Sequence, residues 1–352
     1  MSKIFFVCPD HQKPAGGIKQ IYRQVEVLNH NHIKAYVLHG KKPFKIKWFK
    51  NNVPVLWDHR VSDLNKKKTR RKSKVILSSI IKLPKIIINS PKSKVQFSND
   101  DIIVLPEYYG KDLDNAFSSQ SIVIYNQNCY YTFRGYDIKE SKGDSIYHQN
   151  RLKAVIVASE DALGYLNLFL KNKPLHRIKY GIDHKIFSYS SDKKKQIAFM
   201  PRKLKEDALQ ILNIIYQNQG MKNWDLVPIE GLNEQEVAEV LRDSAIFLSF
   251  NHREGFGMPP AEAMSCGCIV VGYSGQGGNE YFKEEFTYKV PQRNIIVFVN
   301  TLEEVIHNFN SNFEKMIIKG KKASDYIQKH YSMEKEESTI LYTWRNIMLN
   351  HK

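Results

Sequence analysis

Two glutamates eight positions apart, Glu254 and Glu262, frame a glycine-rich turn. The turn opens with Gly255, Phe256 and Gly257, and glycines let backbone N–H groups approach a ligand closely. The helix expected after the turn favours an anion at its N-terminus, and the second carboxylate accepts hydrogen bonds from hydroxyl groups. An anion and a hydroxyl-rich group held side by side indicate a nucleotide sugar as the ligand.

The elements around this turn must hold both carboxylates at one place. Residues 245–250 form an apolar run that predicts a buried strand, so the order is strand, glycine turn, helix start. Glu262 is then expected about two helical turns in, on the face that looks back toward the turn.

Strand-like apolar runs alternate with helical stretches along the whole chain of 352 residues, which is typical of parallel, doubly wound sheets. The first half predicts a glycine loop at 13–18, a helix at 19–29 and strands at 4–8, 35–39, 101–105, 121–125 and 154–158. A polar, lysine-rich linker is predicted at 188–196. The second half predicts helices at 206–217 and 233–243 and strands from 197, near 224–229 and at 269–271. Two such halves form a cleft, with ligands beyond the carboxyl ends of the strands.

The segment from Glu254 to Gly267 resembles the Glu-x7-Glu motif of retaining GT-B glycosyltransferases, the large bacterial family "glycosyl transferases group 1" (family 4). Both glutamates, Gly-Phe-Gly, the proline and the ending Ala-Met-Ser-Cys-Gly carry the match, which is strong over about 230–282 and loose before 120. The resemblance implies an α/β fold of the GT-B type, with two Rossmann-like doubly wound domains facing a cleft. We expect these at 1–185 and 186–330, with a C-terminal helix, 331–352, crossing back to the first domain.

The resemblance also implies roles on the donor side. Arg202 and Lys203 resemble the family's basic pair on the donor diphosphate, although the usual spacing is about five, which leaves Lys205 as an alternative to Lys203. Glu254 is expected beside the donor sugar, the backbone of 255–257 over the phosphates, and Glu262 on the ribose hydroxyls. The pair Gly231-Leu232 resembles the base-binding turn.

In the first half, Gly16-Gly17 matches the family's glycine loop, which is expected to approach the donor phosphate or the acceptor, with a simple helix-start turn as the alternative. On the acceptor side, many relatives carry a histidine where this chain has Asn126-Gln127-Asn128. These amides can bind sugar hydroxyls, but they cannot act as an acid or a base at neutral pH. Glu107, after the strand at 101–105, is a further candidate for the cleft.

No metal or cofactor is expected. Cys266-Gly-Cys268 lacks a second ligand pair and reads as small buried residues. Asp112-Leu-Asp114 has the spacing of a glycosyltransferase metal motif, but its polar flanks favour a surface loop. The start at Met1 leads directly into a strand, so no secretory signal is predicted, and no apolar run is long enough to cross a bilayer. These features favour the cytoplasm.

The net charge of +17 is uneven, because residues 64–99 contain no Asp or Glu. Basic side chains beside apolar clusters in 66–94 suit an anionic membrane surface, at about 1 kcal/mol for each basic residue near the lipid. Any polyanion would attract such a segment, but no nucleic-acid motif accompanies it, so nucleic acid is not expected. A solvated basic loop is the alternative.

The sequence thus predicts a metal-independent hexosyltransferase on the inner face of the membrane. It would move a sugar from a nucleotide diphosphate sugar to a glycan or lipid-linked acceptor in cell-surface polysaccharide synthesis. Two alternatives stay open. A nucleotide-sugar epimerase or hydrolase of the same fold would give products from the donor alone. A non-catalytic subunit that binds a partner or a polyanion would show salt-dependent nucleic-acid binding without nucleotide-sugar binding.

Overall fold

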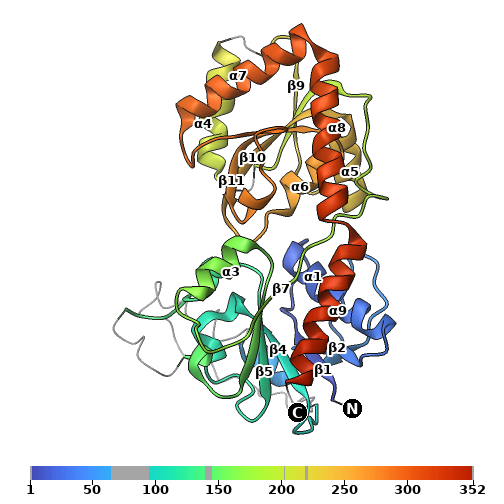
Figure 1. The fold of residues 1–352 in the computed structure, drawn as a ribbon, viewed down its shortest axis with the longest axis vertical. Helices are drawn as coiled ribbons and strands as arrows, with labels where there is room; N and C mark the ends of the chain where they lie inside the picture. The colour runs from blue at the N-terminus through green and yellow to red at the C-terminus, as the bar shows by residue number, and fades with distance from the viewer. Residues whose placement is uncertain (1, 65–94, 139–144, 202, 219–220, 351–352) are drawn as a thin grey trace, which may run out of the picture. The chain divides into compact units, whose positions relative to one another are not determined.

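The computed structural model describes residues 2–64, 95–138, 145–201, 203–218 and 221–350 (Figure 1). The chain divides into two compact units. The first comprises Met1–Val157, Leu166–His176 and Ile340–Lys352, and the second comprises Ala158–Tyr165 and Arg177–Thr339. Each unit is built on its own β-sheet.

The first unit holds a seven-stranded sheet in the order β3-β2-β1-β4-β5-β6-β7. Neighbours from β3 to β6 pair in parallel. Strands such as IFFV and IIVLP are buried at every position, as expected where helices cover both faces of a parallel sheet. The strands are β1 Ile4–Val7, β2 Ala35–His39, β3 Val55–Trp57, β4 Ile102–Pro106, β5 Ser121–Asn126, β6 Leu152–Val157 and β7 Leu175–Arg177.

Helices of the first unit follow its strands. Helix α1 (Gly16–His30) follows β1 and turns one apolar face inward. Helix α3 (Glu160–Asn167) begins just after β6, but most of it belongs to the second unit. Short 3-10 turns are η1 (Glu107–Leu113), η2 (Cys129–Tyr131) and η3 (Ile146–His148). Asp114, at the end of η1, accepts hydrogen bonds from the Tyr136 hydroxyl at 2.5 Å and the Ile146 N–H at 2.8 Å. Its carboxylate therefore has a structural role.

The second unit holds a five-stranded sheet in the order β12-β11-β10-β8-β9, with parallel pairing throughout. A core of apolar side chains, from Ile197 on β8 to Phe309 on α7, packs against it. Its strands are β8 Lys194–Phe199, β9 Asp225–Pro228, β10 Ser244–Glu254, β11 Ile269–Gln276 and β12 Thr287–Lys289. Its helices are α4 Lys205–Gln217, α5 Glu234–Asp243, α6 Met258–Ser265, α7 Ile295–Ser311 and α8 Phe313–His330, with the 3-10 turn η4 at Gly277–Glu280.

The last helix, α9 (Met333–Leu349), ends in the first unit. Trp344 is fully buried there, its ring centroid lies 5.5 Å from that of Phe6, and its indole N–H donates to Gln24 at 2.9 Å. The end of the chain is therefore part of the core around β1.

Three predicted boundaries were wrong. Helix α1 begins at Gly16, so the predicted glycine loop is partly its first turn, and the absence of a side chain at Gly17 leaves room for the side chain of Gln127. Strand β8 begins at Lys194, inside the predicted linker, because its first lysines are exposed at the strand's end. Strand β10 continues past the apolar run to Glu254, since its polar end still pairs with β11.

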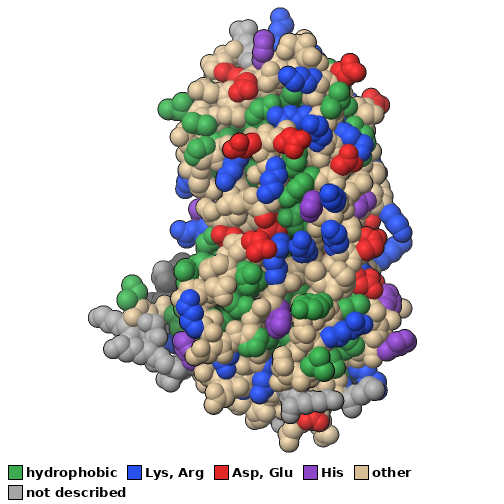
Figure 2. All heavy atoms as spheres, viewed as in Figure 1, with side chains coloured by type: hydrophobic (Ala, Val, Ile, Leu, Met, Phe, Trp, Pro, Cys, Tyr) green, Lys and Arg blue, Asp and Glu red, His purple; other side chains and the backbone are tan. Residues whose placement is uncertain are grey.

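Charged side chains of both signs are intermingled over the face drawn in Figure 2, rather than forming one cationic field. The basic segment 66–94 lies outside the described residues, so its predicted role at an anionic membrane surface stays a prediction. Across the described part of the chain, no helix combines the length and apolarity needed to cross a bilayer.

Candidate functional site

The second sheet changes direction between β8 and β10. From β8 the chain runs through α4 to β9 on one side, whereas from β10 it runs through α6 to β11 on the other. Ligands of open α/β sheets bind at such a switch point, beyond the carboxyl ends of the strands. Lys203 follows β8 and Glu254 ends β10, so two of the three predicted catalytic residues stand at this switch point.

The side chains of Lys203 and Glu254 meet there as an ion pair. The ammonium-bearing side chain is 37% exposed and the carboxylate-bearing one 15%, so the pair is close to solvent but partly shielded from it. This arrangement places a positive and a negative group where a ligand would enter. Arg202, the third predicted catalytic residue, lies outside the described residues.

Strained backbone surrounds the crevice. Leu204 follows Lys203 with φ 44°, Arg253 precedes Glu254 with φ 48°, and Gln276 ends β11 with φ 72°. Non-glycine residues rarely adopt positive φ, and such conformations concentrate at functional sites, where surrounding structure enforces them. Three of the seven non-glycine residues with positive φ in the described part of the chain therefore lie beside the charged pair.

Gly257 shapes the turn after Glu254. It is the N-cap of α6, with φ 85° and ψ 69°, in the left-handed region. A Cβ atom added there would lie 2.6 Å from Asn251 Nδ2 and 3.0 Å from Tyr281 Oη. Glycine is thus required both by the backbone conformation and by the space around it.

The direction of each backbone N–H group in this turn follows from the direction of the carbonyl in the same peptide. Tyr281 Oη lies 2.5 Å from the carbonyl oxygen of Gly257 and 3.1 Å from that of Phe256. A trans peptide is planar with its N–H opposite its C=O, so the N–H groups of Gly257 and Met258 point away from Tyr281. A left-handed residue followed by a helical one makes such consecutive N–H groups an anion-binding nest.

Only a few residues at the start of α6 can donate a backbone N–H to a ligand. Pro259 and Pro260 occupy the first turn of α6 and have no N–H group. The Phe256 side chain is 2% exposed and packs in the core, against Tyr180, Tyr281 and Tyr331, so only its backbone is available to a ligand. Donation to an anion here thus depends mainly on the Gly257 and Met258 N–H groups.

Glu262 lies on α6, half-buried, in the fifth position of the helix. Its charge is among the groups that raise the pKa of Tyr281, after burial, Glu280 and Tyr331. The carboxylate is therefore near the same turn. Gly231 and Leu232 follow the carboxyl end of β9, and β9 is the neighbour of β8 in the sheet. They therefore lie at the same end of the strands as Lys203 and Glu254.

Three residues at this site were missed from the sequence. Asn251 is 7% exposed, and its Nδ2 has no hydrogen-bond partner among the described residues. A Cβ atom on Gly275 would lie 2.7 Å from Asn251 Cβ, and one on Gly277 would lie 2.2 Å from the Gly255 oxygen. The glycine-rich segment 275–278, which spans the end of β11 and the start of η4, was the available signal for this contact between two turns.

In the first unit the switch point lies between β1 and β4. Glu107 follows β4, is 4% exposed, and accepts hydrogen bonds from the Gln127 and Asn128 N–H groups at 3.0 Å each. The Gln127 amide donates to the Gly17 carbonyl at 3.0 Å, and a Cβ atom on Gly17 would lie 3.1 Å from Gln127 Oε1. Two predicted acceptor-side residues, Glu107 and Gln127, are thus brought together with Gly17 of the predicted glycine loop.

Other predicted residues of this group have protein partners of their own. Asn126 is fully buried and donates to the Thr132 hydroxyl at 2.8 Å. Asn128 caps η2, where its side-chain oxygen accepts from the Tyr130 N–H at 3.1 Å. Gly16 has open space around it. Gln127 is thus the amide side chain that reaches the glycine segment.

Glu107 is expected to make stability depend on pH. Burial raises its pKa from the usual 4.5 to about 7, against the opposing effect of the hydrogen bonds from Gln127 and Asn128. The folded state therefore binds a proton that the unfolded state releases between pH 4.5 and 7. The stabilisation is complete below this window and is lost as pH rises through it, by up to ~1.4 kcal/mol for each pH unit.

Unfolding midpoints and free energies, measured from pH 4.5 to 8 for wild type and Glu107→Gln, test this expectation. The free energy of unfolding of wild type should fall more steeply with pH than that of the variant. Parallel curves would show that Glu107 titrates normally.

Comparisons with known proteins give one family match and several similar proteins. Residues 226–323, which include the Glu254–Glu262 segment, match the family "Glycosyl transferases group 1". The chain is 32% identical over 212 residues to an alpha-1,6-glucosyltransferase of Actinobacillus pleuropneumoniae, and the aligned region covers 58% of this chain and 61% of that protein.

Solved structures match nearly the full chain. Sucrose-phosphate synthase from Thermosynechococcus elongatus is 12% identical with a TM-score of 0.66, over 99% of this chain and all of that one. Anabaena HepE, solved in complex with UDP-glucose, is 10% identical with a TM-score of 0.63, over 98% of this chain and all of that one. The GT-B fold and the resemblance predicted from the motif are therefore confirmed.

Proposed function

We propose that this protein is a retaining glycosyltransferase that moves a hexose from a nucleotide diphosphate sugar to a glycan or lipid-linked acceptor, without a metal. One observation carries the proposal. The Lys203–Glu254 pair stands at the switch point of the second sheet, next to the N–H groups of Gly257 and Met258. A cation, a carboxylate and an anion nest at one crevice suit a diphosphate joined to a sugar.

The roles follow from charge. Bond breaking at the anomeric carbon leaves negative charge on the diphosphate and positive charge on the sugar. Fixed donors where charge develops are the most effective means of stabilisation. Lys203 and the nest would hold the departing diphosphate, Glu254 would face the positive sugar, and Glu262 would accept hydrogen bonds from the ribose. The acceptor oxygen then bonds to the anomeric carbon on the face that the diphosphate leaves.

The proton of the acceptor hydroxyl needs a base. Gln127, the amide that reaches the glycine segment of the first unit, cannot accept it at neutral pH. In our proposal the departing diphosphate oxygen takes this proton, since its charge grows as the bond breaks. Gly17 and Gln127 would then bind the acceptor rather than perform proton transfer.

The relatives suggest which donor to test first. The relative from A. pleuropneumoniae is an alpha-1,6-glucosyltransferase, and HepE was solved with UDP-glucose. UDP-glucose is therefore the first donor in our proposal, and a cell-surface polysaccharide is the expected destination of the sugar. An epimerase or hydrolase of the same fold is the second candidate, and it would convert the donor without an acceptor.

Thermal stabilisation by a panel of nucleotide sugars tests the proposal, with Glu262→Ala as the comparison. A donor present at about 100 times its dissociation constant should stabilise wild type by about 2.7 kcal/mol, and the variant by much less. Donor incubated alone then separates transfer from epimerisation or hydrolysis. No stabilisation by any donor, with or without glycan acceptors, would favour a non-catalytic binding protein.

A further inference from the structure

The hydroxyl of Tyr281 occupies a niche that two glycines leave open. Tyr281 is fully buried, and its side chain approaches the carbonyls of Phe256 and Gly257 from the core. A Cβ atom on either Gly257 or Gly278 would lie 3.0 Å from this oxygen. The absence of side chains at Gly257 and Gly278 thus leaves room for the Tyr281 hydroxyl on the core side of the turn that follows Glu254.

The ring that carries this hydroxyl is firmly held. Its centroid lies 5.1 Å from that of Phe256 and 6.1 Å from that of Tyr331, in an aromatic cluster. Such ring contacts each add roughly 0.5–1.5 kcal/mol beyond the area they bury. The phenol therefore has little freedom to leave the two carbonyls.

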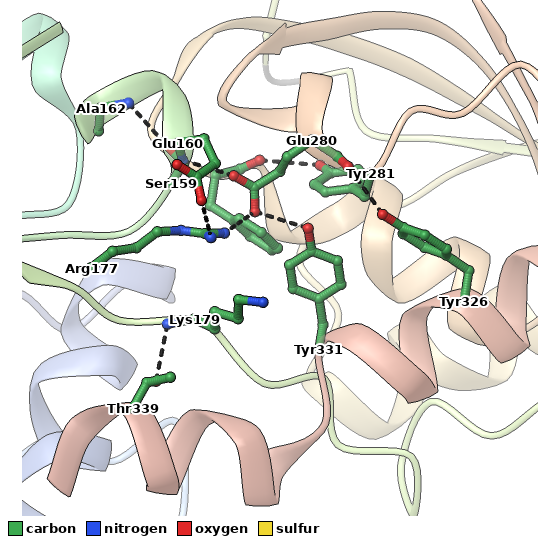
Figure 3. Close-up of polar contacts among 11 residues, drawn as sticks. Ser159, Glu160, Ala162, Arg177, Lys179, Glu280, Tyr281, Tyr326, Tyr331 and Thr339 are labelled. Atoms are coloured by element: carbon green, nitrogen blue, oxygen red, sulfur yellow. Dashed lines mark hydrogen bonds and ion pairs between the residues drawn. The ribbon is translucent and has the colours of Figure 1, made fainter. Parts of the chain in front are cut away.

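The neighbouring residue Glu280 anchors the segment before the ring (Figure 3). Its carboxylate accepts from the Arg177 guanidinium at 2.5 Å, the Tyr331 hydroxyl at 2.9 Å and the Glu160 N–H at 2.9 Å. All these groups belong to the second unit. Turn η4 is thus bonded on one side to this network, and on the other side Gly277 packs closely against the backbone of the Glu254 turn.

The two carbonyls matter because they determine where two N–H groups point. Holding the Phe256 carbonyl directs the Gly257 N–H, and holding the Gly257 carbonyl directs the Met258 N–H, since each peptide is planar. With prolines at the next two positions, these are the main donors of the helix start. A hydroxyl in the core therefore controls the geometry of the anion nest on the other side of the backbone.

We propose that Tyr281 is a positioning residue, whose hydroxyl fixes the direction of the Gly257 and Met258 N–H groups toward the donor diphosphate. The inference rests on the proposed function for the identity of the anion. It adds a residue that contacts no substrate and yet controls how the diphosphate is held. A purely structural hydroxyl would contribute to folding stability and leave diphosphate recognition unchanged.

Tyr281→Phe removes the hydroxyl and keeps the ring. Tyr136→Phe is the matched control. Its hydroxyl donates to Asp114, and both residues lie in the first unit, whereas Tyr281 lies in the second. Titration calorimetry with UDP and with uridine separates the diphosphate from the rest of the nucleotide. We expect Tyr281→Phe to weaken UDP binding by about tenfold and to leave uridine binding unchanged, and to lower kcat by roughly 10- to 100-fold, because small misplacements of binding groups reduce rates steeply. The control should change neither.

Hydrogen exchange of the peptide spanning 255–264 provides a readout that needs no ligand. Its amides should exchange faster in Tyr281→Phe than in wild type or Tyr136→Phe. Unchanged exchange, or equal weakening of UDP and uridine, would overturn the positioning role. If wild type binds neither ligand while exchange still accelerates, the proposed donor fails and the role of Tyr281 in orienting the turn stands.

Discussion

Glu254→Gln and Lys203→Met are each expected to lower kcat by about 100- to 1,000-fold, with little change in folding stability. The two side chains form the ion pair at the switch point, where both are partly shielded from solvent. Removing one pre-organised charged group from such a site typically raises the barrier by roughly 2.7–4 kcal/mol. The pair is partly exposed, so its loss has little effect on folding. Steady-state transfer from the donor that stabilises wild type, together with unfolding midpoints, measures both effects.

A second ion pair of the same unit provides the control. Lys322 and Glu285 lie 3.0 Å apart, with side chains 57% and 64% exposed. Lys322→Met and Glu285→Gln remove the same charges and should leave kcat within about twofold of wild type, since exposed pairs contribute little. The double variant of Lys203 and Glu254 should lose less than the product of the single effects, because residues in contact couple. Single variants with near-normal kcat would remove this pair from the catalytic machinery.

Gly257→Ala is expected to abolish measurable transfer and nucleotide-sugar binding and to lower stability. The added methyl group would stand 2.6 Å from Asn251 Nδ2 and 3.0 Å from Tyr281 Oη. Alanine also tolerates φ 85° poorly, at a cost of about 1–2 kcal/mol, and the crowding adds roughly 1–3 kcal/mol. The crowded atoms are the ends of two side chains, which must move, and the backbone must shift to relieve the positive φ, so the N–H groups of the turn shift with it. Unfolding free energy and donor binding by calorimetry report the two effects separately.

Gly164→Ala is the comparison for this variant. Gly164 lies in α3 with nothing within 4 Å of an added Cβ atom, and its backbone needs no left-handed conformation. There the same substitution should stabilise the protein by about 0.5–1 kcal/mol through helix propensity and should leave transfer unchanged. If Gly257→Ala behaves like Gly164→Ala, the close packing of the turn is not required for donor binding.

The sequence by itself determined the short segments of secondary structure and the turns between them. The order of strand, glycine turn and helix around Glu254 followed from the apolar run and the glycines, and β10, Gly257 and α6 bear it out. Alternating strands and helices predicted two parallel sheets, and both are present. These features are readable because periodicity and glycine chemistry act within a few residues of one another.

Which side chains of these segments meet one another depended on the tertiary structure. Lys203 meets Glu254 because the second sheet places β8 beside β10, and the Gly257 carbonyl meets the Tyr281 hydroxyl across 24 residues of chain. Glu107 likewise finds the N–H groups of Gln127 and Asn128 only because β4 and β5 are neighbours. The order of strands in a sheet follows from the packing of the whole domain rather than from any local pattern. The sequence therefore determined the motif and its backbone, and the strand order decided which side chains hold it in place.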